Sequence, residues 1–361
     1  MYSFEPSEEQ KMLIDAISRY ATNDLRTAAH DAEENKELPP KLISKGWELG
    51  VLQASIPEVY GGFGERSAVT GALAAEELAC GDLAGALAVG TPGIFALPIL
   101  LIGSEEQKKK FLPPISAGDW KPFTAALIEP AFDFDPNAMK TTAKPEGSDY
   151  ILSGEKTMVP FADKAETMIV YARLEQSTRA FIVPRGAPGM KLGEEREKFM
   201  GLNAIPFFKV TLEGVKVPKD SLLVGDFAPV LNASRVATAA MALGVAKAAF
   251  GYARDYAKDR DVFGVKAAQK QAIAFMLAEM ATEIEAMRLL VWEAAWTIDN
   301  NKEDSGQKAY LAVTGVIDMV MMVTDRAVQI LGGHGYIREH PVELWMRNGR
   351  GFASFTGLAM V

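Results

Sequence analysis

The chain has 361 residues, which is long enough for more than one packed layer with its own hydrophobic core. Hydrophobic residues make up 48% and charged residues 24%, so the composition is that of a folded globular protein and not of a disordered one. The net charge of -9 opposes a nucleic-acid-binding surface, because such a surface needs a stripe of basic residues. We therefore expect no nucleic-acid partner.

Cysteine and histidine are too scarce for the usual disulfide and metal sites. The single cysteine, Cys80, excludes a disulfide framework and a CxxC site. The histidines are dispersed and lack the HExxH spacing, so no metal is expected. The start of the chain, MYSFEPSEEQ, is too polar for a secretory signal, and Gly and Pro interrupt the longest apolar runs. We expect a cytoplasmic protein with no membrane partner.

Residues 1–121 are predicted to form an N-terminal helical domain. In SEEQ, Ser7 and Gln10 form a capping box, and apolar residues at helical spacing follow it. The segment ELPPKLISKGWELG predicts a helix that begins after its proline pair and ends at the closing glycine. The segment GSEEQKKKFLPPISAGD predicts a short helix that is stopped by Pro113 and Pro114.

The remaining chain divides into strands and then helices. Residues 122–224 contain the runs YILSGEKTMV, ETMIVYARL and FFKVTLEGVKVP, which are rich in β-branched and aromatic residues and predict a small antiparallel β-domain. Residues 225–361 contain long Ala-rich helical patterns, typical of a bundle that is buried on several faces and packs against another subunit. The fold class is therefore α+β and mostly α.

Several segments resemble the signature of the acyl-CoA dehydrogenase family. They are YAKDRDVFG followed by Gln271, QILGGHGYIREHPVELWMRNGR, LGVLQASIPEVYGGFG, GSEEQKKKFLPPISAGD, and the IEP at the head of the β-segment. The resemblance covers essentially the whole chain and includes the order of its blocks. It implies an N-terminal helical domain, a middle antiparallel β-barrel-like domain and a C-terminal four-helix bundle, which here is truncated at its end. Such proteins usually assemble as tetramers.

The resemblance also implies FAD as the cofactor and the α,β-dehydrogenation of an acyl-CoA as the reaction. A carboxylate removes the α-proton while a β-hydride passes to the flavin, and the electrons then leave to a flavoprotein carrier. In the family, FAD lies between the β-domain of one subunit and the bundle of its neighbour. Its binding residues therefore fall into two sets.

One set reaches across the interface to the adenosine-diphosphate half of the neighbour's FAD, and this sequence retains it. A guanidinium suits a pyrophosphate, and paired glycines let main-chain amides approach a ligand. The alternative interpretation is that Arg260 caps a helix and that Gly332–Gly333 ends one. The set consists of Arg260, Phe263, Gln271, Gln329, Gly332 and Gly333.

The set expected in the same subunit as the flavin ring departs from the family pattern. T-E-P-x-A-G-S-D becomes IEPAFDFDP, with Ile128 in place of the Thr and Asp133–Phe134 in place of Gly-Ser. Isoleucine offers no hydrogen bond, and the phenylalanine is expected to fill space. G-x-K-x-[WF]-[IV]-T becomes GEKTMVP, with Met158 at the aromatic position and Pro160 at the Thr that bonds flavin N5.

The catalytic base is missing from both positions that the family uses. Laying RNGRGFASFTGL on the pattern R-D-A-K-I-x-x-I-Y-E-G-T puts Thr356 at the catalytic Glu. The alternative position, just before an Arg at the start of the long bundle helix, is held by Ser234 before Arg235. A hydroxyl group lacks the basicity to take an α-proton. Arg235 is expected to pack or pair at the end of the bundle.

The resemblance thus implies a non-catalytic subunit of a heterotetrameric (α2β2) acyl-CoA dehydrogenase. A paralogous catalytic subunit would bind the acyl-CoA substrate, in known cases often a bulky one such as a steroid side chain, and would share the FAD. Electron-transfer flavoprotein is the expected acceptor. Two alternatives stay open: a self-sufficient homotetrameric flavoenzyme with Glu129 or Asp133 as an unusual base, and a flavin-free binding or scaffold protein of the same fold.

Overall fold

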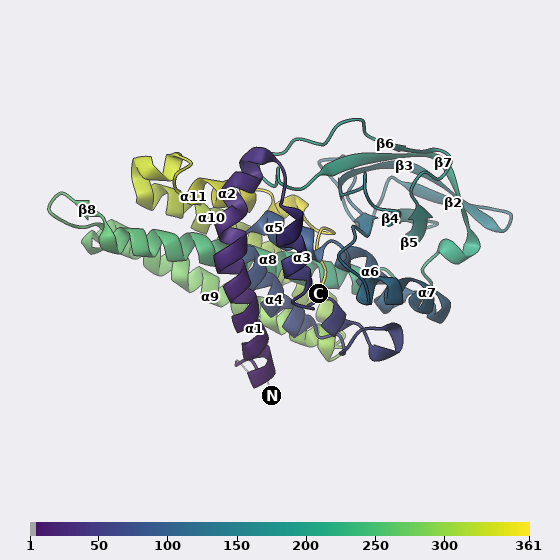
Figure 1. The fold of residues 1–361 in the computed structure, drawn as a ribbon, viewed down its shortest axis with the longest axis horizontal. Helices are drawn as coiled ribbons and strands as arrows, with labels where there is room; N and C mark the ends of the chain where they lie inside the picture. Colours follow the sequence, from purple (N-terminus) through teal and green to yellow (C-terminus); the bar gives the residue numbers. More distant parts are fainter. Residues whose placement is uncertain (1–4) are drawn as a thin grey trace.

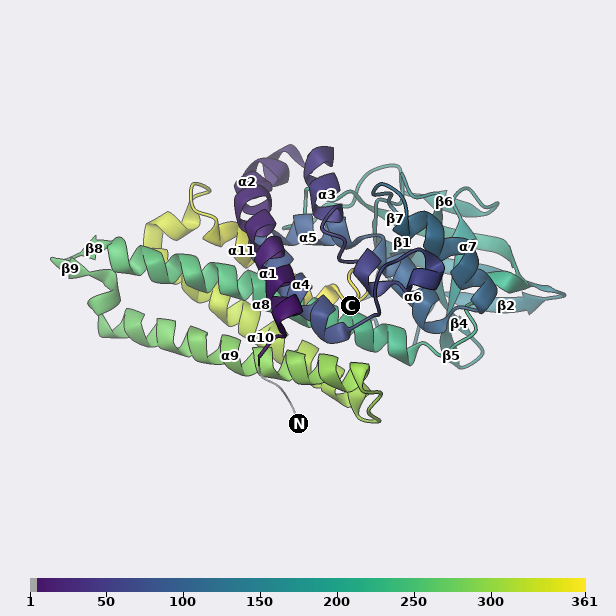
Figure 2. The same cartoon turned by 60° about the horizontal axis from the view of Figure 1, so that its bottom comes forward.

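The computed structural model describes residues 5–361 as helices, then a sheet, then helices again, in one elongated molecule (Figure 1). Residues 1–4, the start of the predicted N-terminal domain, lie outside the described residues. The sheet lies at one end of the molecule, and the long C-terminal helices run side by side toward the other end (Figure 2). Of the N-terminal helices, those within residues 8–90 lie over the middle of the molecule, and those within residues 93–116 lie beside the sheet (Figure 1).

Seven α-helices precede the sheet. A π-helical turn, η1 (Ala21–Leu25), joins the first two of them. The predicted capping box is confirmed: the main-chain N of Gln10 donates to Ser7 Oγ at 3.2 Å, and the main-chain N of Ser7 donates to Gln10 Oε1 at 2.9 Å. The helices are α1 (Glu8–Tyr20), α2 (Arg26–Asn35), α3 (Pro40–Trp47), α4 (Ala68–Gly81), α5 (Leu83–Gly90), α6 (Gly93–Ile102) and α7 (Glu105–Ser116).

Helix α7 does not stop at its prolines, so that prediction is wrong. Pro113 and Pro114 lie inside the helix, which continues to Ser116. Each proline removes one main-chain donor, but the carbonyl groups that lose a partner belong to Lys109 and Lys110, which are exposed. Water can satisfy those carbonyls, so the last turn survives.

The middle of the chain forms a single seven-stranded sheet with the order β1-β4-β2-β3-β7-β6, and β5 pairs with β4. The sheet is mixed and not purely antiparallel, because β1 and β2 both run parallel to β4. The sequence pattern does not reveal this, since neither parallel partner is adjacent to β4 in the chain. The strands are β1 (Thr124–Ala126), β2 (Thr142–Glu146), β3 (Asp149–Pro160), β4 (Thr167–Leu174), β5 (Ser177–Pro184), β6 (Met190–Leu192) and β7 (Phe207–Pro218).

The C-terminal part consists of three long helices and a short one. Successive long helices are antiparallel, so the end of the first, the start of the second and the end of the third lie at the same end of the bundle (Figure 2). A two-stranded hairpin extends from that end. The elements are α8 (Ala228–Asp259), β8 (Asp261–Val262), β9 (Val265–Lys266), α9 (Gln271–Asp299), α10 (Ser305–Leu331) and α11 (Val342–Gly349).

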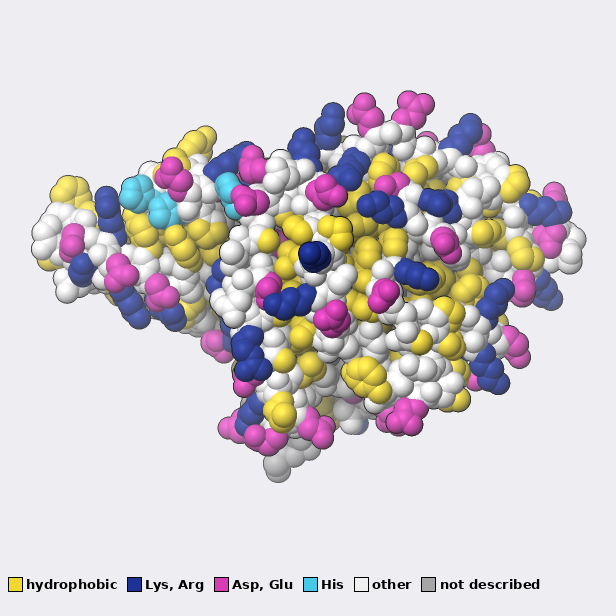
Figure 3. Space-filling model, viewed as in Figure 1, with side chains coloured by type: hydrophobic (Ala, Val, Ile, Leu, Met, Phe, Trp, Pro, Cys, Tyr) yellow, Lys and Arg dark blue, Asp and Glu magenta, His cyan; other side chains and the backbone are white. Residues whose placement is uncertain are grey.

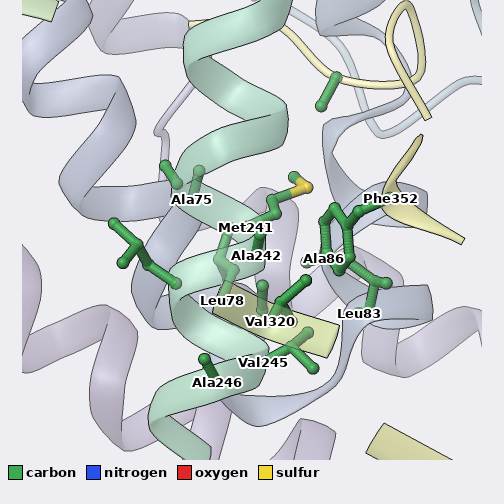
Figure 4. Packing of buried hydrophobic residues seen from close by; sticks show 14 of the residues in the cluster. Ala75, Leu78, Leu83, Ala86, Met241, Ala242, Val245, Ala246, Val320 and Phe352 are labelled. Carbon is green, nitrogen blue, oxygen red and sulfur yellow. The ribbon is translucent and has the colours of Figure 1, made fainter. Parts of the chain in front are cut away.

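Helix α8 is the centre of the core. Figure 4 shows side chains of α8 packed among those of α4 and α5, with Val320 of α10 and with Phe352. At Gly244 the contact with α4 is so close that a Cβ atom would lie 2.2 Å from the main-chain O of Glu76. Glycine is therefore required where α8 crosses α4.

The segment 351–361 is part of this core. Phe352, Leu358 and Val361 are buried, and a Cβ at Gly71 of α4 would lie 2.8 Å from Val361. The side chain of Arg66 donates two hydrogen bonds to the main-chain O of Val361, at 2.6 and 3.0 Å. A segment without ionisable side chains is therefore suited to its place, because it passes between buried helices.

By length and composition, α8 could cross a membrane, as could α5 and α6 if they were counted as one span bent by 49°. Within the apolar window of α8, 78% of the residues are buried inside the protein, as in the core helix of a bundle. On the face shown in Figure 3, basic and acidic side chains are interspersed.

Candidate functional site

A cavity of about 640 Å³ lies between the sheet and the bundle. Its walls come from the loop after β1, the end of β3, the first turns of α8, one face of α10, and the segment 353–356. Positions that are more than two hundred residues apart in the sequence thus meet in one place. Its lining includes Ile128, Glu129, Phe132, Phe134, Met158, Phe199, Arg235, Tyr310, Ile317 and Thr356.

Both positions that the family uses for the base converge on this cavity. Thr356 lies in its wall, and Ser234 is completely buried directly behind it. The main-chain N of Gly357 donates to Ser234 Oγ at 2.7 Å, so the two segments are joined by a hydrogen bond. Neither position presents a carboxylate to the cavity. That neither residue serves as a base stays a prediction.

Glu129 is the acidic residue in the lining, and its carboxylate is engaged in structural contacts. One oxygen accepts from Lys156 Nζ at 3.0 Å and from the main-chain N of Thr141 at 2.7 Å, and the other accepts from the main-chain N of Lys140 at 2.8 Å. Burial favours the protonated form, but the ammonium of Lys156 and these N–H donors outweigh it and hold the pKa of Glu129 below its ordinary value. Such a carboxylate is a poor base.

Asp133, the other alternative base, is exposed and is absent from the described cavity lining. Its carboxylate accepts from Lys140 Nζ at 3.1 Å, and this hydrogen bond lowers its pKa. The neighbouring Phe134 turns inward, where it lines the cavity and packs against the core, as expected for a space-filling residue.

The motif that would hold a flavin ring in this chain is satisfied internally. Ile128 and Met158 are buried, and Pro160 uses its carbonyl to accept from Thr124 Oγ1 at 2.7 Å. Glu197, which the sequence pattern did not single out, accepts from the hydroxyl of Thr157 and from the main-chain N of Met158, the latter at 2.7 Å. The donors of this motif at Thr157 and Met158 are therefore already bonded to the carboxylate of Glu197. For this reason the motif does not fit a flavin ring.

Arg235 packs, as expected, but does not pair. Its guanidinium lies over the ring of Tyr310, with the guanidinium carbon 5.2 Å from the ring centroid. No acidic side chain within residues 5–361 forms an ion pair with it. Burial lowers the pKa of Arg235, and Tyr310 and Asp135 offset this only in part.

The six residues predicted to reach a neighbour's FAD all lie at the hairpin end of the bundle. Arg260 follows the last residue of α8, and Gln271 begins α9. Gln329 lies in the last turn of α10, and Gly332–Gly333 follows that helix. All of them are exposed. A Cβ atom at either glycine would meet nothing within 4 Å, so a ligand could approach the main chain there.

Phe263 of this set and the adjacent Gly264 have a local structural role that the sequence did not reveal. Phe263 and Gly264 have positive φ angles of 51° and 81° and connect the two short strands of the hairpin. Two central residues with positive φ are the requirement of a tight hairpin turn. The turn leaves the side chain of Phe263 93% exposed at the tip. The ammonium of Lys270 lies 5.9 Å from the centroid of this ring.

Two histidines that looked dispersed in the sequence are stacked beside the glycine loop. The rings of His334 and His340 lie 5.2 Å apart at an angle of 12°. Each is hydrogen-bonded to a tyrosine of α8: Tyr256 Oη lies 2.8 Å from His334 Nδ1, and Tyr252 Oη lies 2.7 Å from His340 Nδ1. The spacing of the tyrosines, one helical turn, was the available signal. These bonds fasten the glycine loop to α8.

Comparison with known proteins agrees with this architecture. The descriptions "Acyl-CoA dehydrogenase, N-terminal domain", "middle domain" and "C-terminal domain" match residues 7–119, 124–215 and 227–359. The chain is 35% identical to the caffeyl-CoA reductase-Etf complex subunit CarC of Acetobacterium woodii, over 98% of this chain and 96% of that protein. It is 33% identical to the short-chain specific acyl-CoA dehydrogenase of Bos taurus mitochondria, over 96% of this chain and 86% of that protein.

The structure is also similar to that of butyryl-CoA dehydrogenase from Megasphaera elsdenii, with a TM-score of 0.88, 31% identity, and coverage of 99% of this chain and 96% of that one. The fold and the matches together define the class of protein: a family of oxidoreductases that act on CH–CH groups and whose members bind FAD. The chain belongs to the acyl-CoA dehydrogenase family.

Proposed function

We propose that this chain is the non-catalytic subunit of a heteromeric, FAD-dependent acyl-CoA dehydrogenase. The observation that carries the proposal is that Thr356, in the cavity wall, and buried Ser234, which bonds the main-chain N of the adjacent Gly357, offer hydroxyl groups and no carboxylate. A paralogous subunit then supplies the base, binds the acyl-CoA and holds the flavin ring. The present chain completes the FAD site from across the interface.

The two sets of flavin-site residues support this division. The residues at the hairpin end are exposed and open to a ligand, and Arg260 forms no ion pair with any acidic side chain of residues 5–361. In contrast, two residues of the cavity lining, Thr157 and Met158, already donate hydrogen bonds to the carboxylate of Glu197. A pyrophosphate suits the first set, and a flavin ring does not suit the second.

The relatives favour a particular acceptor and substrate size. One is named as a subunit of a complex with Etf, which supports electron-transfer flavoprotein as the acceptor of the complete enzyme. The names refer to caffeyl-CoA and to short-chain substrates, and so favour a thioester of that size over a steroid side chain. The homotetrameric alternative has lost support, because Glu129 is engaged and Asp133 is exposed.

The proposal is tested by expressing the chain alone and together with a paralogue that carries the catalytic Glu. We expect the chain alone to be colourless or poorly folded. The mixed complex should be yellow, with one FAD for every two chains, and should oxidise acyl-CoA. A stable yellow homotetramer of this chain that oxidises acyl-CoA would contradict the proposal.

A further inference from the structure

We propose that the cavity beside Arg235 is a binding site for an organic monoanion, namely a carboxylate with an aromatic or branched apolar body. The guanidinium of Arg235 holds the carboxylate, and the aromatic walls hold the body. The inference rests on the proposed function in one respect. If the paralogous subunit holds the flavin ring, this cavity is free for another ligand.

The first support is the state of Arg235 compared with two partly buried arginines that form ion pairs, Arg288 and Arg347. Arg288 forms ion pairs with Glu76 and Glu285. Burial alone would lower its pKa, but these carboxylates raise the pKa of Arg288 above its ordinary value. Arg347 is balanced in the same way by Glu33 and Glu343.

Arg235 has no such partner. Asp135, the acidic residue that acts on it, is exposed and forms no ion pair with it within the described part of the chain. An unpaired cation that is partly removed from water is unfavourable, and an anionic ligand would relieve that cost. The contact that the guanidinium makes with Tyr310 is to the ring and not to an anion, and the planar fork of N–H groups of an arginine suits a carboxylate.

The second support is the nature of the walls. Phe134, Phe199 and Ile317 line the cavity together with Tyr310, so most of a ligand's surface would meet rings and branched side chains. Phe132 belongs to the lining but is fully exposed, which leaves its ring available to cover a ligand. A cavity of about 640 Å³ is of the size that small-molecule sites have.

The third support is the charge of the lining. Arg235 is the basic residue among the described lining residues, and the acidic one, Glu129, is neutralised by Lys156. One uncompensated positive charge matches a single negative charge. A carboxylate carries one, whereas a phosphate monoester carries close to two at neutral pH.

The experiment uses the co-expressed complex and isothermal calorimetry with 3-phenylpropionate. We expect saturable binding at one site for each copy of this chain. Arg235→Gln in this chain should weaken binding on the order of tenfold or more, because a charge-assisted hydrogen bond is lost. The neutral analogue 3-phenylpropanol should bind more weakly by a similar factor.

Arg254→Gln is the matched control. Arg254 also lies on α8 over an aromatic ring, but it lies outside this cavity, so the substitution should leave the affinity for 3-phenylpropionate unchanged.

The flavin content of the same preparations separates the two possible failures. If one FAD is present for every two chains and 3-phenylpropionate does not bind, or binds the Arg235→Gln complex equally well, the anion site is wrong while the proposed function stands. If every copy of this chain holds its own FAD, the proposed function is wrong and the inference falls with it.

Discussion

Lys156 Nζ lies 3.0 Å from Glu129 Oε1, and the side chains are 0% and 4% exposed. This buried ion pair gives the Glu of IEP and the Lys of GEK a structural role. Lys156 also donates to the main-chain O of Leu127 at 3.1 Å, so the pair ties β3 to the loop after β1. It is a structural element and not part of a proton relay.

Glu129→Gln is therefore expected to destabilise the fold by about 3–5 kcal/mol, because it leaves the ammonium of Lys156 buried without its counter-charge. The free energy of unfolding in urea measures this. Replacing both residues, by Glu129→Gln with Lys156→Met, should recover much of the loss. An unchanged stability combined with lost dehydrogenase activity of the complex would instead indicate that Glu129 is a base.

Gly244→Ala is expected to lower the unfolding temperature strongly, because the new Cβ would lie 2.2 Å from the main-chain O of Glu76. The matched control is Gly251→Ala in the same helix, where nothing lies within 4 Å. That change should stabilise the protein by about 0.5–1 kcal/mol through helix propensity. Similar effects of the two substitutions would contradict the close crossing of α4 and α8.

Asp82 predicts a pH dependence. Its carboxylate accepts from the main-chain N of Gly85 at 2.7 Å at the start of α5, and burial, only partly offset by this bond, raises the pKa of Asp82 to about 6. A carboxyl group with a raised folded-state pKa contributes stability below its unfolded pKa, and that stability is lost as the pH rises through about 6.

Between pH 3.5 and 6.5 the wild type should therefore lose roughly 3 kcal/mol of stability relative to Asp82→Asn, which keeps an acceptor but does not titrate. Urea unfolding of both proteins across this range provides the measurement. Parallel curves would show that the pKa of Asp82 is not raised by folding.

Tyr256→Phe is expected to loosen the glycine loop, since the hydroxyl that bonds His334 is lost. Loss of one such hydrogen bond corresponds to about 1 kcal/mol. We expect FAD to dissociate severalfold faster from the mixed complex, with little change in unfolding temperature. Tyr150→Phe, in the sheet, is the control and should retain FAD normally. Equal retention in both variants would mean that this bond does not position the loop.

The sequence predicted those parts of the fold that depend on residues close to one another in the chain. The capping box at Ser7 and the strands that became β3, β4 and β7 follow from local patterns. The parallel pairing of β1 and β2 with β4 could not be predicted in this way, because it joins strands that are not adjacent in the chain. The continuation of α7 through its prolines depends on solvent reaching the orphaned carbonyls.

The candidate site shows the same limit. The sequence could predict that Thr356 and Ser234 stand at the positions of the base, but it could not predict their contact through the hydrogen bond from the main-chain N of Gly357. Glu197 escaped notice because its two donors lie about forty residues earlier in the chain. The unpaired state of Arg235 follows only from the absence of an acidic partner in the surrounding described structure, which no spacing encodes.

The most direct test of trans donation is FAD retention in the mixed complex when this chain carries Arg260→Ala. We expect the complex to assemble and to lose FAD on gel filtration, although the flavin ring lies on the partner, because the guanidinium contact to the pyrophosphate is gone. Arg254→Ala, one and a half turns earlier on α8, is the matched control and should retain FAD. Full retention of FAD by the Arg260→Ala complex would contradict the claim that this chain completes its partner's site.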